Sequence, residues 1–169
     1  PSLTHFTYTT LFRSERDLCM PSVKEPVIIE SSFHVRYAET DAMGVVHHAG
    51  YLVYFEEARS HYMRVLGSDY ALIERQGFRL PVTEVGLRYL GSLCYGDRVK
   101  VRAGVGENRS RQIRFASDIL KERDDSVLVT GFTQHIWTNL SGKFTLAPQH
   151  RVDMVESGRT SLPYITGSQ

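Results

Sequence analysis

Residues 37–59 read YAETDAMGVVHHAGYLVYFEEAR, and the hydrophobic pattern changes its period inside this stretch. Just before it, Phe33–Tyr37 alternates apolar and polar side chains, which indicates a short strand. The segment Glu39–Gly44 breaks that alternation, and its glycine favours a turn. Residues at helical spacing then follow, namely Tyr51, Tyr54, Phe55, Ala58, Tyr62, Val65 and Leu66. The stretch predicts a strand, a turn and a helix of about four turns that Gly67 closes.

Downstream of this helix, Asp69–Gln76 predicts a second short helix that Gly77 stops. Alternation with period two then predicts four strands, over residues 81–90, 99–105, 111–120 and 127–138. The turn at Asp124–Ser126 and the short spacings indicate antiparallel neighbours. One strand, one long helix and four strands predict an α+β fold, with the helix on one face of an antiparallel sheet. The pattern does not fix the strand order.

The composition sets limits on the kind of protein. The chain has 169 residues, which is the length of one domain with a core of its own. The formal net charge is +1, so no bulk charge favours nucleic acid or an anionic membrane. Cys19 and Cys94 have no metal-like spacing, and two free thiols in a reducing compartment are expected. No apolar run is long enough to span a membrane.

The first 19 residues show neither helical nor strand periodicity, and they lack the basic and apolar regions of a signal peptide. Within them, Tyr8–Ser14 resembles the translation of a common sequencing adaptor. We therefore interpret residues 1–19 as an artefact, with Met20 as the natural start; a native disordered extension is the alternative. We expect an extension over residues 1–29, a folded domain over 30–156 and a flexible Ser/Gly/Thr-rich tail over 157–169.

The stretch Tyr37–Arg59 resembles the signature of the 4-hydroxybenzoyl-CoA thioesterase family. That signature runs Tyr-x-Asp/Glu-Thr-Asp-x-x-Gly-Val-Val-Tyr/His-His-x-x-Tyr, followed by a helix that ends Phe-x-Glu-x-Ala-Arg. The resemblance is closest to the branch of bacterial acyl-CoA thioester hydrolases that includes the Tol-Pal-associated enzymes. Weaker similarity continues through residues 82–85, 95–97 and 109–111, so the resemblance covers residues 31–155.

This resemblance implies the hot-dog fold, in which a five-stranded antiparallel sheet wraps one long central helix. It implies a cytoplasmic acyl-CoA thioesterase that releases a free acid and coenzyme A. The acyl group is open between short-chain, medium-chain and aromatic classes. A homodimer, often paired into a homotetramer, with active sites at the subunit interface, is also implied.

Asp41 matches the catalytic aspartate of the family, as nucleophile or as general base on water. The alternative is a turn or capping role, which aspartate favours at such positions. His48 matches the position whose backbone N–H donates to the thioester carbonyl, and free N–H groups at a helix start suit that task. Its side chain could line the pocket. His47 stands where relatives carry an aromatic residue, and it is expected to line the substrate pocket.

Four further residues are assigned to substrate binding through the same motif: Gly44, Val46, Tyr51 and Glu56. Two of them, Tyr51 and Glu56, have a structural alternative. Tyr51 could belong to the core, since aromatic residues at helical spacing usually do. Glu56 could be a buried or half-buried structural carboxylate or pair with Arg59, although a related hot-dog branch uses a helix glutamate in catalysis.

Coenzyme A carries phosphate groups, which basic residues must meet locally because the net charge is near zero. Arg109, Ser110 and Arg111 match nucleotide-contacting positions of relatives; ordinary surface arginines in a hairpin are the alternative. Coenzyme A is part of the substrate, so no separate cofactor is expected. The pair His47–His48 lacks the companions of a metal site, so no metal is expected either.

Two other functions compete with thioester hydrolysis. A hot-dog hydratase or dehydratase needs a histidine with an acidic partner, which His47 or His48 with Glu56 could supply. A non-catalytic acyl-CoA-binding module would bind without turnover. An intact Asp41 argues against both, and also against carrier-protein enzymes that replace the acid by asparagine.

Overall fold

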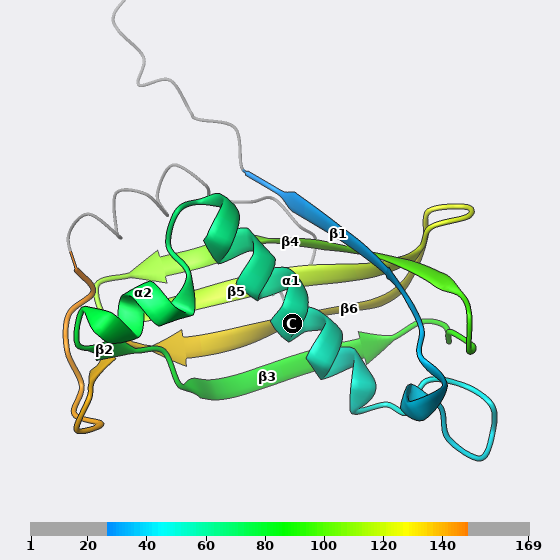
Figure 1. Ribbon diagram of the computed structural model, residues 1–169, viewed down its shortest axis with the longest axis horizontal. Coiled ribbons are helices and arrows are strands. Elements are labelled where there is room, and N and C mark those ends of the chain that lie inside the picture. The colour runs from blue at the N-terminus through cyan, green and yellow to red at the C-terminus, as the bar shows by residue number, and fades with distance from the viewer. Residues whose placement is uncertain (1–26, 149–169) are drawn as a thin grey trace, which may run out of the picture.

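The computed structural model describes residues 27–148, in which one long helix lies across a five-stranded antiparallel sheet (Figure 1). The strands follow one another in space in the order β1-β4-β5-β6-β3. Their bounds are Ile29–His34 for β1, Val82–Tyr89 for β3, Arg98–Arg109 for β4, Gln112–Lys121 for β5 and Ser126–Ile136 for β6. The predicted α+β hot-dog fold is confirmed.

The long helix, α1, runs from Gly50 to Val65. Its buried face carries the aromatic residues that the sequence placed there, together with two more side chains: Tyr51, Tyr54, Phe55, Ala58, Arg59, Tyr62 and Met63. Gly67 follows with φ of +70°, a left-handed conformation that glycine adopts at little cost and that ends the helix as predicted. The prediction was wrong for Val65, the last residue of the helix, which is 53% exposed.

The strand predicted at Phe33–Tyr37 lies four residues earlier. Pairing of β1 with β4 begins at Ile29, opposite Ala103, and ends at His34, opposite Arg98. Residues Tyr37–Glu39 instead form a single 3₁₀ turn, η1. Hydrogen bonding to β4 therefore set the limits of this strand, whereas local alternation marked only its end.

The second short helix, α2, spans Tyr70–Arg75. The Asp69 side chain accepts a hydrogen bond from the Leu72 N–H at 2.7 Å, which caps the helix start. Gly77 follows with φ of +90°. A second sheet, made of β2 (Phe78–Arg79) and β7 (Thr138–Asn139), was not predicted, because strands of two residues carry no readable period.

The core lies between α1 and the sheet face that it covers. On β4, alternate side chains are fully buried, as the pattern predicted: Val99, Val101, Ala103 and Val105. The intervening Lys100 and Arg102 lie on the opposite face of the sheet, where both form ion pairs. The inward side chains of the strands, at every second residue, thus pack against those of α1, at helical spacing, in one apolar core.

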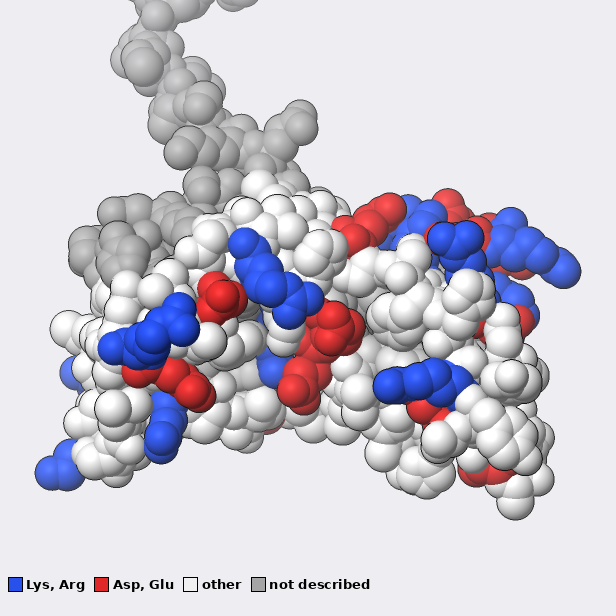
Figure 2. Space-filling view, in the orientation of Figure 1, with Lys and Arg blue, Asp and Glu red and all other residues white. Residues whose placement is uncertain are grey.

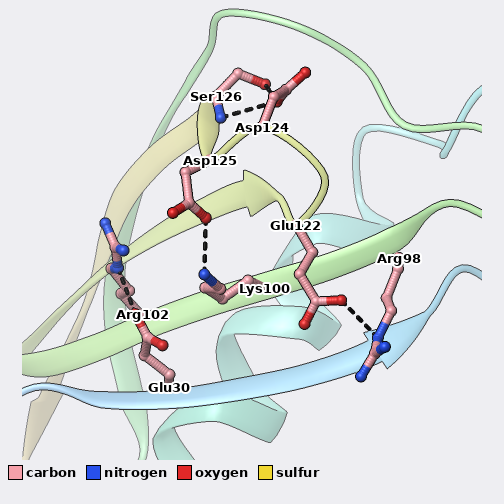
Figure 3. A network of polar contacts seen from close by, with 8 residues as sticks. All are labelled: Glu30, Arg98, Lys100, Arg102, Glu122, Asp124, Asp125 and Ser126. Atoms are coloured by element: carbon pink, nitrogen blue, oxygen red, sulfur yellow. Dashed lines mark hydrogen bonds and ion pairs between the residues drawn. The ribbon is translucent and has the colours of Figure 1, made fainter.

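Ion pairs join β1 and the β5–β6 turn to β4 on the outer side of the sheet (Figure 3). Arg102 on β4 pairs with Glu30 on β1 at 2.7 Å, and Lys100 pairs with Asp125 of the turn at 2.7 Å. Arg98 meets Glu122 at 2.6 Å. These pairs are partly exposed, so solvent screens them and each contributes little to the stability of the fold.

Most of the predicted extension and all of the tail, residues 1–26 and 157–169, lie outside the described residues. The boundary drawn at residue 29 falls inside β1, since Ile29 is its first residue. Cys94 is a free, exposed thiol, while Cys19 is outside the described part. In the stretch from 27 to 148, no helix is long and apolar enough to cross a membrane.

Candidate active site in the loop before α1

The loop before α1 turns tightly at Asp41. The Asp41 N–H donates to the Val45 carbonyl at 2.9 Å, and the Gly44 N–H donates to the Asp41 carbonyl at 2.9 Å. Gly44 has φ of +75°, so a side chain at this position would be strained. One carboxylate oxygen of Asp41, Oδ1, accepts the Met43 N–H at 2.8 Å. Asp41 is therefore a turn-forming residue, and its Oδ2 has no partner among residues 27–148.

The same loop leads into the helix start with one backbone donor left over. The His47 N–H donates to the Glu39 carbonyl at 2.9 Å, and the Gly50 N–H donates to the His47 carbonyl at 2.8 Å. Between them, the His48 N–H makes no hydrogen bond within the described residues. No side chain caps the helix at Ala49. A free N–H at the positive end of α1 can stabilise negative charge on an oxygen atom.

Glu39 clamps this loop, and sequence reasoning missed it. Its carboxylate accepts hydrogen bonds from the Arg36 backbone at 2.7 Å, from the Arg36 guanidinium at 2.6 and 2.9 Å, and from the Tyr54 hydroxyl at 2.7 Å. Burial alone would raise the pKa of Glu39, but these hydrogen bonds outweigh burial and lower it. Burial and the bond to Glu39 raise the pKa of Tyr54. The Arg36-x-x-Glu39 spacing was the available signal.

A cavity of about 610 Å³ opens beside this clamp. Asp41, Glu39 and His47 line it, together with Gly50 and Val53 of α1. The His47 ring accepts the Ala49 N–H at 3.3 Å and lies 4.1 Å from the His48 ring, centroid to centroid. Cavities of this size hold small-molecule substrates. Asp41 and His47 thus share one cavity, at the N-terminal end of the helix.

Other predicted site residues lie around this cavity rather than in its lining. Val46 and Tyr51 are 3% and 2% exposed and belong to the core beneath the loop. The Tyr51 hydroxyl accepts a hydrogen bond from the Leu93 N–H at 3.2 Å. The pKa of Tyr51 is raised, mainly because the side chain is buried. Gly44 is exposed at the tip of the turn. Direct contact of these residues with a substrate stays a prediction.

Glu56 is exposed on α1, so the alternative of a buried structural carboxylate is wrong. Its expected partner Arg59 is in phase with Phe55 and Tyr62 on the inner face of the helix, and is 8% exposed. The Arg59 guanidinium reaches Thr133 Oγ1 at 3.2 Å and His135 Nε2 at 3.0 Å instead. Burial, and then the Arg59 charge, lower the pKa of His135 to about 4. The helical period places Arg59 on the inner face, but it does not reveal the partners on β6 that its charge contacts.

Arg109, Ser110 and Arg111 form the β4–β5 turn, at the other end of the sheet from Asp41 (Figure 1). All three are exposed, and Arg109 pairs with Glu107 at 3.2 Å. The Asp41 end of β4 is marked by the Val45–Cys94 bridge just before the strand. The two places lie at opposite ends of β4, which is twelve residues long. One protomer does not bring its catalytic and basic candidates together.

The surface over α1 is electrically mixed. Figure 2 shows acidic and basic side chains next to one another over this face, without a broad area of one sign. Within residues 27–148, no group of three or more His, Cys, Asp or Glu side chains is arranged to hold a metal ion. The chemistry available at the cavity is that of a carboxylate, a backbone N–H and imidazole rings.

Comparison with known proteins identifies the class. Residues 35–156 match the model of the thioesterase-like superfamily, so the chain belongs to that family. The acyl-CoA thioesterase YbgC of Haemophilus influenzae is 36% identical over 93 residues, which are 53% of this chain and 68% of that protein. A Bacillus subtilis relative is 37% identical over 78 residues, which are 46% of this chain and 56% of that protein.

A solved structure agrees with these matches. The DHNA-CoA thioesterase of Staphylococcus aureus superimposes with a TM-score of 0.71 at 32% identity, over 77% of this chain and 87% of that one. The chain is therefore a thioesterase-like protein whose relatives are thioester hydrolases, and this is the class that its fold defines.

Proposed function

We propose that this protein hydrolyses an acyl-CoA thioester to the free acid and coenzyme A, with Asp41 as its catalytic carboxylate. The observation that carries the proposal is the loop Asp41–His48. It holds a carboxylate oxygen without a partner and a backbone N–H without an acceptor among the described residues, beside one cavity. Thioester hydrolysis needs both groups.

The two groups divide the chemistry between them. The His48 N–H, at the positive end of α1, would donate to the thioester oxygen, where negative charge develops during attack. Asp41 would either attack the acyl carbon or take a proton from an attacking water. In both routes an oxygen of water ends on the acyl carbon, the carbon–sulfur bond breaks, and the thiol leaves with a proton.

Several finer assignments belong to the same proposal. We assign the protein to the 4-hydroxybenzoyl-CoA thioesterase branch that includes the Tol-Pal-associated enzymes, on the motif Tyr37–Arg59. Its acyl group would be short-chain, medium-chain or aromatic, and the protein would act in the cytoplasm without metal or separate cofactor. His47, Gly44, Val46, Tyr51 and Glu56 would shape the substrate pocket.

We further propose that a second copy completes the site. β3 is the last strand of the sheet, and its far edge is unpaired within the described residues. It exposes apolar side chains that water disfavours, namely Val82, Val85, Tyr89 and the following Leu90. Pairing of two β3 strands about a two-fold axis would cover this edge and form one continuous sheet.

Such a pair would also bring the separated candidates together. The Tyr89 hydroxyl donates to the His48 carbonyl at 2.9 Å, so the end of β3 lies beside the Asp41 loop. Antiparallel pairing sets this end against the start of the partner's β3, the end of the sheet that carries the β4–β5 turn. Arg109–Arg111 of one copy would then meet coenzyme A bound at Asp41 of the other. Pairing of two dimers would give the tetramer.

Free-thiol release from a panel of acyl-CoA substrates tests the activity. The panel contains butyryl-, dodecanoyl- and benzoyl-CoA, and we expect turnover of at least one. Enoyl-CoA absorbance in parallel tests for hydration or dehydration. Binding of coenzyme A with no thiol release from any substrate would contradict the proposal and indicate a binding module.

A further inference from the structure

A second cavity, of about 570 Å³, runs between β1 and α1. We name it the β1–α1 groove and define it by the lining residues Ser31, Phe33, Val53, Tyr54, His61 and Arg64. Its middle is apolar, with Phe33 edge-on against Tyr54 at a centroid distance of 4.9 Å. A groove of this volume exceeds what a short acyl group needs and suits a longer one.

The groove joins the cavity at Asp41. Both are lined by Arg36 and by Val53, which is 52% exposed on the surface of α1. The two cavities therefore adjoin at Val53 and Arg36, and a chain that reached from one into the other would pass over the exposed side of Val53. From Gly50, beside Asp41, to His61 the helix rises about 16 Å. That length fits an extended medium chain and is too long for a single aromatic ring.

The far end of the groove carries a hydrogen-bonded pair of polar side chains. Ser31 Oγ and His61 Nδ1 are hydrogen-bonded at 2.8 Å, and both side chains are half-buried. The second ring nitrogen of His61 has no partner within the described residues, so the pair can still donate to or accept from a ligand. An alkyl chain laid over this pair would remove its water and return no hydrogen bond.

The charged side chains that line the groove are already paired. Arg36 meets Glu39 at 2.6 Å and Arg64 meets Glu57 at 3.3 Å. Glu30 meets Arg102 at 2.7 Å. A charged ligand group would have to compete with these pairs, whereas an uncharged hydroxyl would find Ser31 and His61 available.

We propose that the β1–α1 groove holds the acyl chain of the substrate, and that Ser31 and His61 recognise a neutral oxygen at its far end. The preferred substrate class is a medium-chain acyl thioester with a terminal hydroxyl group. This inference rests on the proposed thioesterase function, because it extends from the cavity at Asp41. Val53 is the residue that the chain passes.

Binding of thioether analogues of coenzyme A tests the groove independently of hydrolysis. The analogues carry butyl, dodecyl or ω-hydroxydodecyl chains, and calorimetry gives their dissociation constants. We expect the hydroxylated analogue to bind roughly five- to tenfold more tightly than dodecyl, as one added hydrogen bond allows. Ser31→Ala with His61→Phe should abolish this preference. Ser60→Ala, the matched control beside His61 and outside the groove lining, should keep it.

A second variant tests the path rather than its end. Val53→Trp fills the passage at an exposed helix position, where a large side chain does not disturb the core. Because Val53 also lines the Asp41 cavity, all three analogues should bind less tightly, but the two long analogues should lose about tenfold more affinity than the butyl analogue. Equal affinity of the two long analogues in the wild type, or long-chain binding unaffected by Val53→Trp, overturns the proposal.

The failures of the two proposals can be told apart. Hydrolysis of butyryl-CoA by the wild type depends on Asp41 and makes no use of the far end of the groove. If butyryl-CoA is hydrolysed but the chain preference is absent, the groove assignment fails and the thioesterase function stands. If the hydroxylated analogue is preferred but no thioester is hydrolysed, the groove assignment stands and the thioesterase function fails.

Discussion

The two ends of the sheet are built differently. At one end, the Asp41 loop is held by short hydrogen bonds, and Glu39 alone accepts four of them. At the other end, the β4–β5 turn presents Arg109 and Arg111 to solvent, with Arg109 held only by an exposed pair to Glu107. Rigid positioning suits a group that acts on a reacting bond, and an exposed, adjustable charge suits a phosphate.

The difference suggests that the two ends do different work on one substrate. They lie at opposite ends of the twelve-residue strand β4. If both ends act on the same coenzyme A thioester, they must come from two copies.

Asp41→Asn should have the largest effect. We expect kcat to fall by about a hundredfold or more, because the side chain loses its charge and its power to attack or to take a proton. Free-thiol release measures this, with circular dichroism to check the fold. Asp124→Asn is the matched control, since Asp124 also accepts a backbone N–H two residues ahead, from Ser126 at 3.1 Å. Wild-type turnover in Asp41→Asn would redirect attention to Glu56.

Glu39→Gln should lower kcat by roughly tenfold with little change in KM, because the loop loses its charge-assisted bonds to Arg36. Tyr54→Phe, which removes one bond to Glu39, should have a smaller effect, and Glu39→Asp should restore part of kcat. Glu122→Gln, which breaks the exposed pair with Arg98, is the control. A lower kcat in Glu39→Gln that is matched by an equal loss of the circular dichroism signal would instead argue for a general loss of structure.

The same carboxylate predicts a pH effect on stability. Because the pKa of Glu39 is lowered in the folded state, its stabilising contribution is present above the unfolded pKa. It is lost as the pH falls through the folded pKa. The free energy of unfolding, measured with denaturant, should therefore decrease less steeply from neutral to acid pH in Glu39→Gln than in the wild type. An equal pH dependence of the free energy of unfolding in both proteins would contradict a stabilising role of Glu39.

Arg109→Ala should raise the KM for acyl-CoA by roughly fivefold, through the loss of one charge-assisted hydrogen bond, and leave kcat nearly unchanged. Arg123→Ala, an exposed arginine in the hairpin at the other end, is the matched control.

Mixing separately purified Asp41→Asn and Arg109→Ala proteins under exchange conditions then tests which chain supplies the arginine. A hybrid dimer has one intact site if Arg109 acts on the partner's substrate. Wild-type KM should reappear in the mixture. A mixture that keeps the raised KM would assign Arg109 to its own chain or to no site.

The smallest effect concerns His135, at the β4–β5 end. Its pKa falls from 6.5 in the unfolded chain to about 4 in the fold, so the folded state binds fewer protons between these values. Stability is full above pH 6.5 and declines as the pH drops, by about 1 kcal/mol between pH 7 and 5.5. Urea unfolding at both pH values measures this. His135→Gln should remove most of the decline, and His47→Gln, at an exposed position, should keep it.

Much of the fold was readable from local pattern. The bounds of α1, the stop at Gly67 and the inward residues of β4 follow from hydrophobic period and glycine conformation, which are properties of neighbouring residues. The candidate catalytic loop was readable as well, because the motif is contiguous and its turn depends on Asp41 and Gly44 themselves.

The features that the sequence analysis predicted wrongly or missed depend mainly on partners that are distant in the chain. The limits of β1 were set by pairing with β4, about 70 residues later, and β2 found β7 across 60 residues. Arg59 is buried because a helix phase placed it against His135, and no local signal marks a cation that will lose its water. Of the four hydrogen bonds to Glu39, three come from nearby Arg36, and only the one from Tyr54 depends on the helix packing beside the loop.

The sequence by itself determined the α+β class, the helix, the strand phases and Asp41 as the residue to test. Only the tertiary structure decided the strand order, the separation of Asp41 from Arg109–Arg111, the Glu39 clamp and the groove between β1 and α1. The physical reason is range. Backbone preference and hydrophobic period act within a few residues, whereas ion pairs, strand partners and cavities arise between segments whose distance in space the chain order does not reveal.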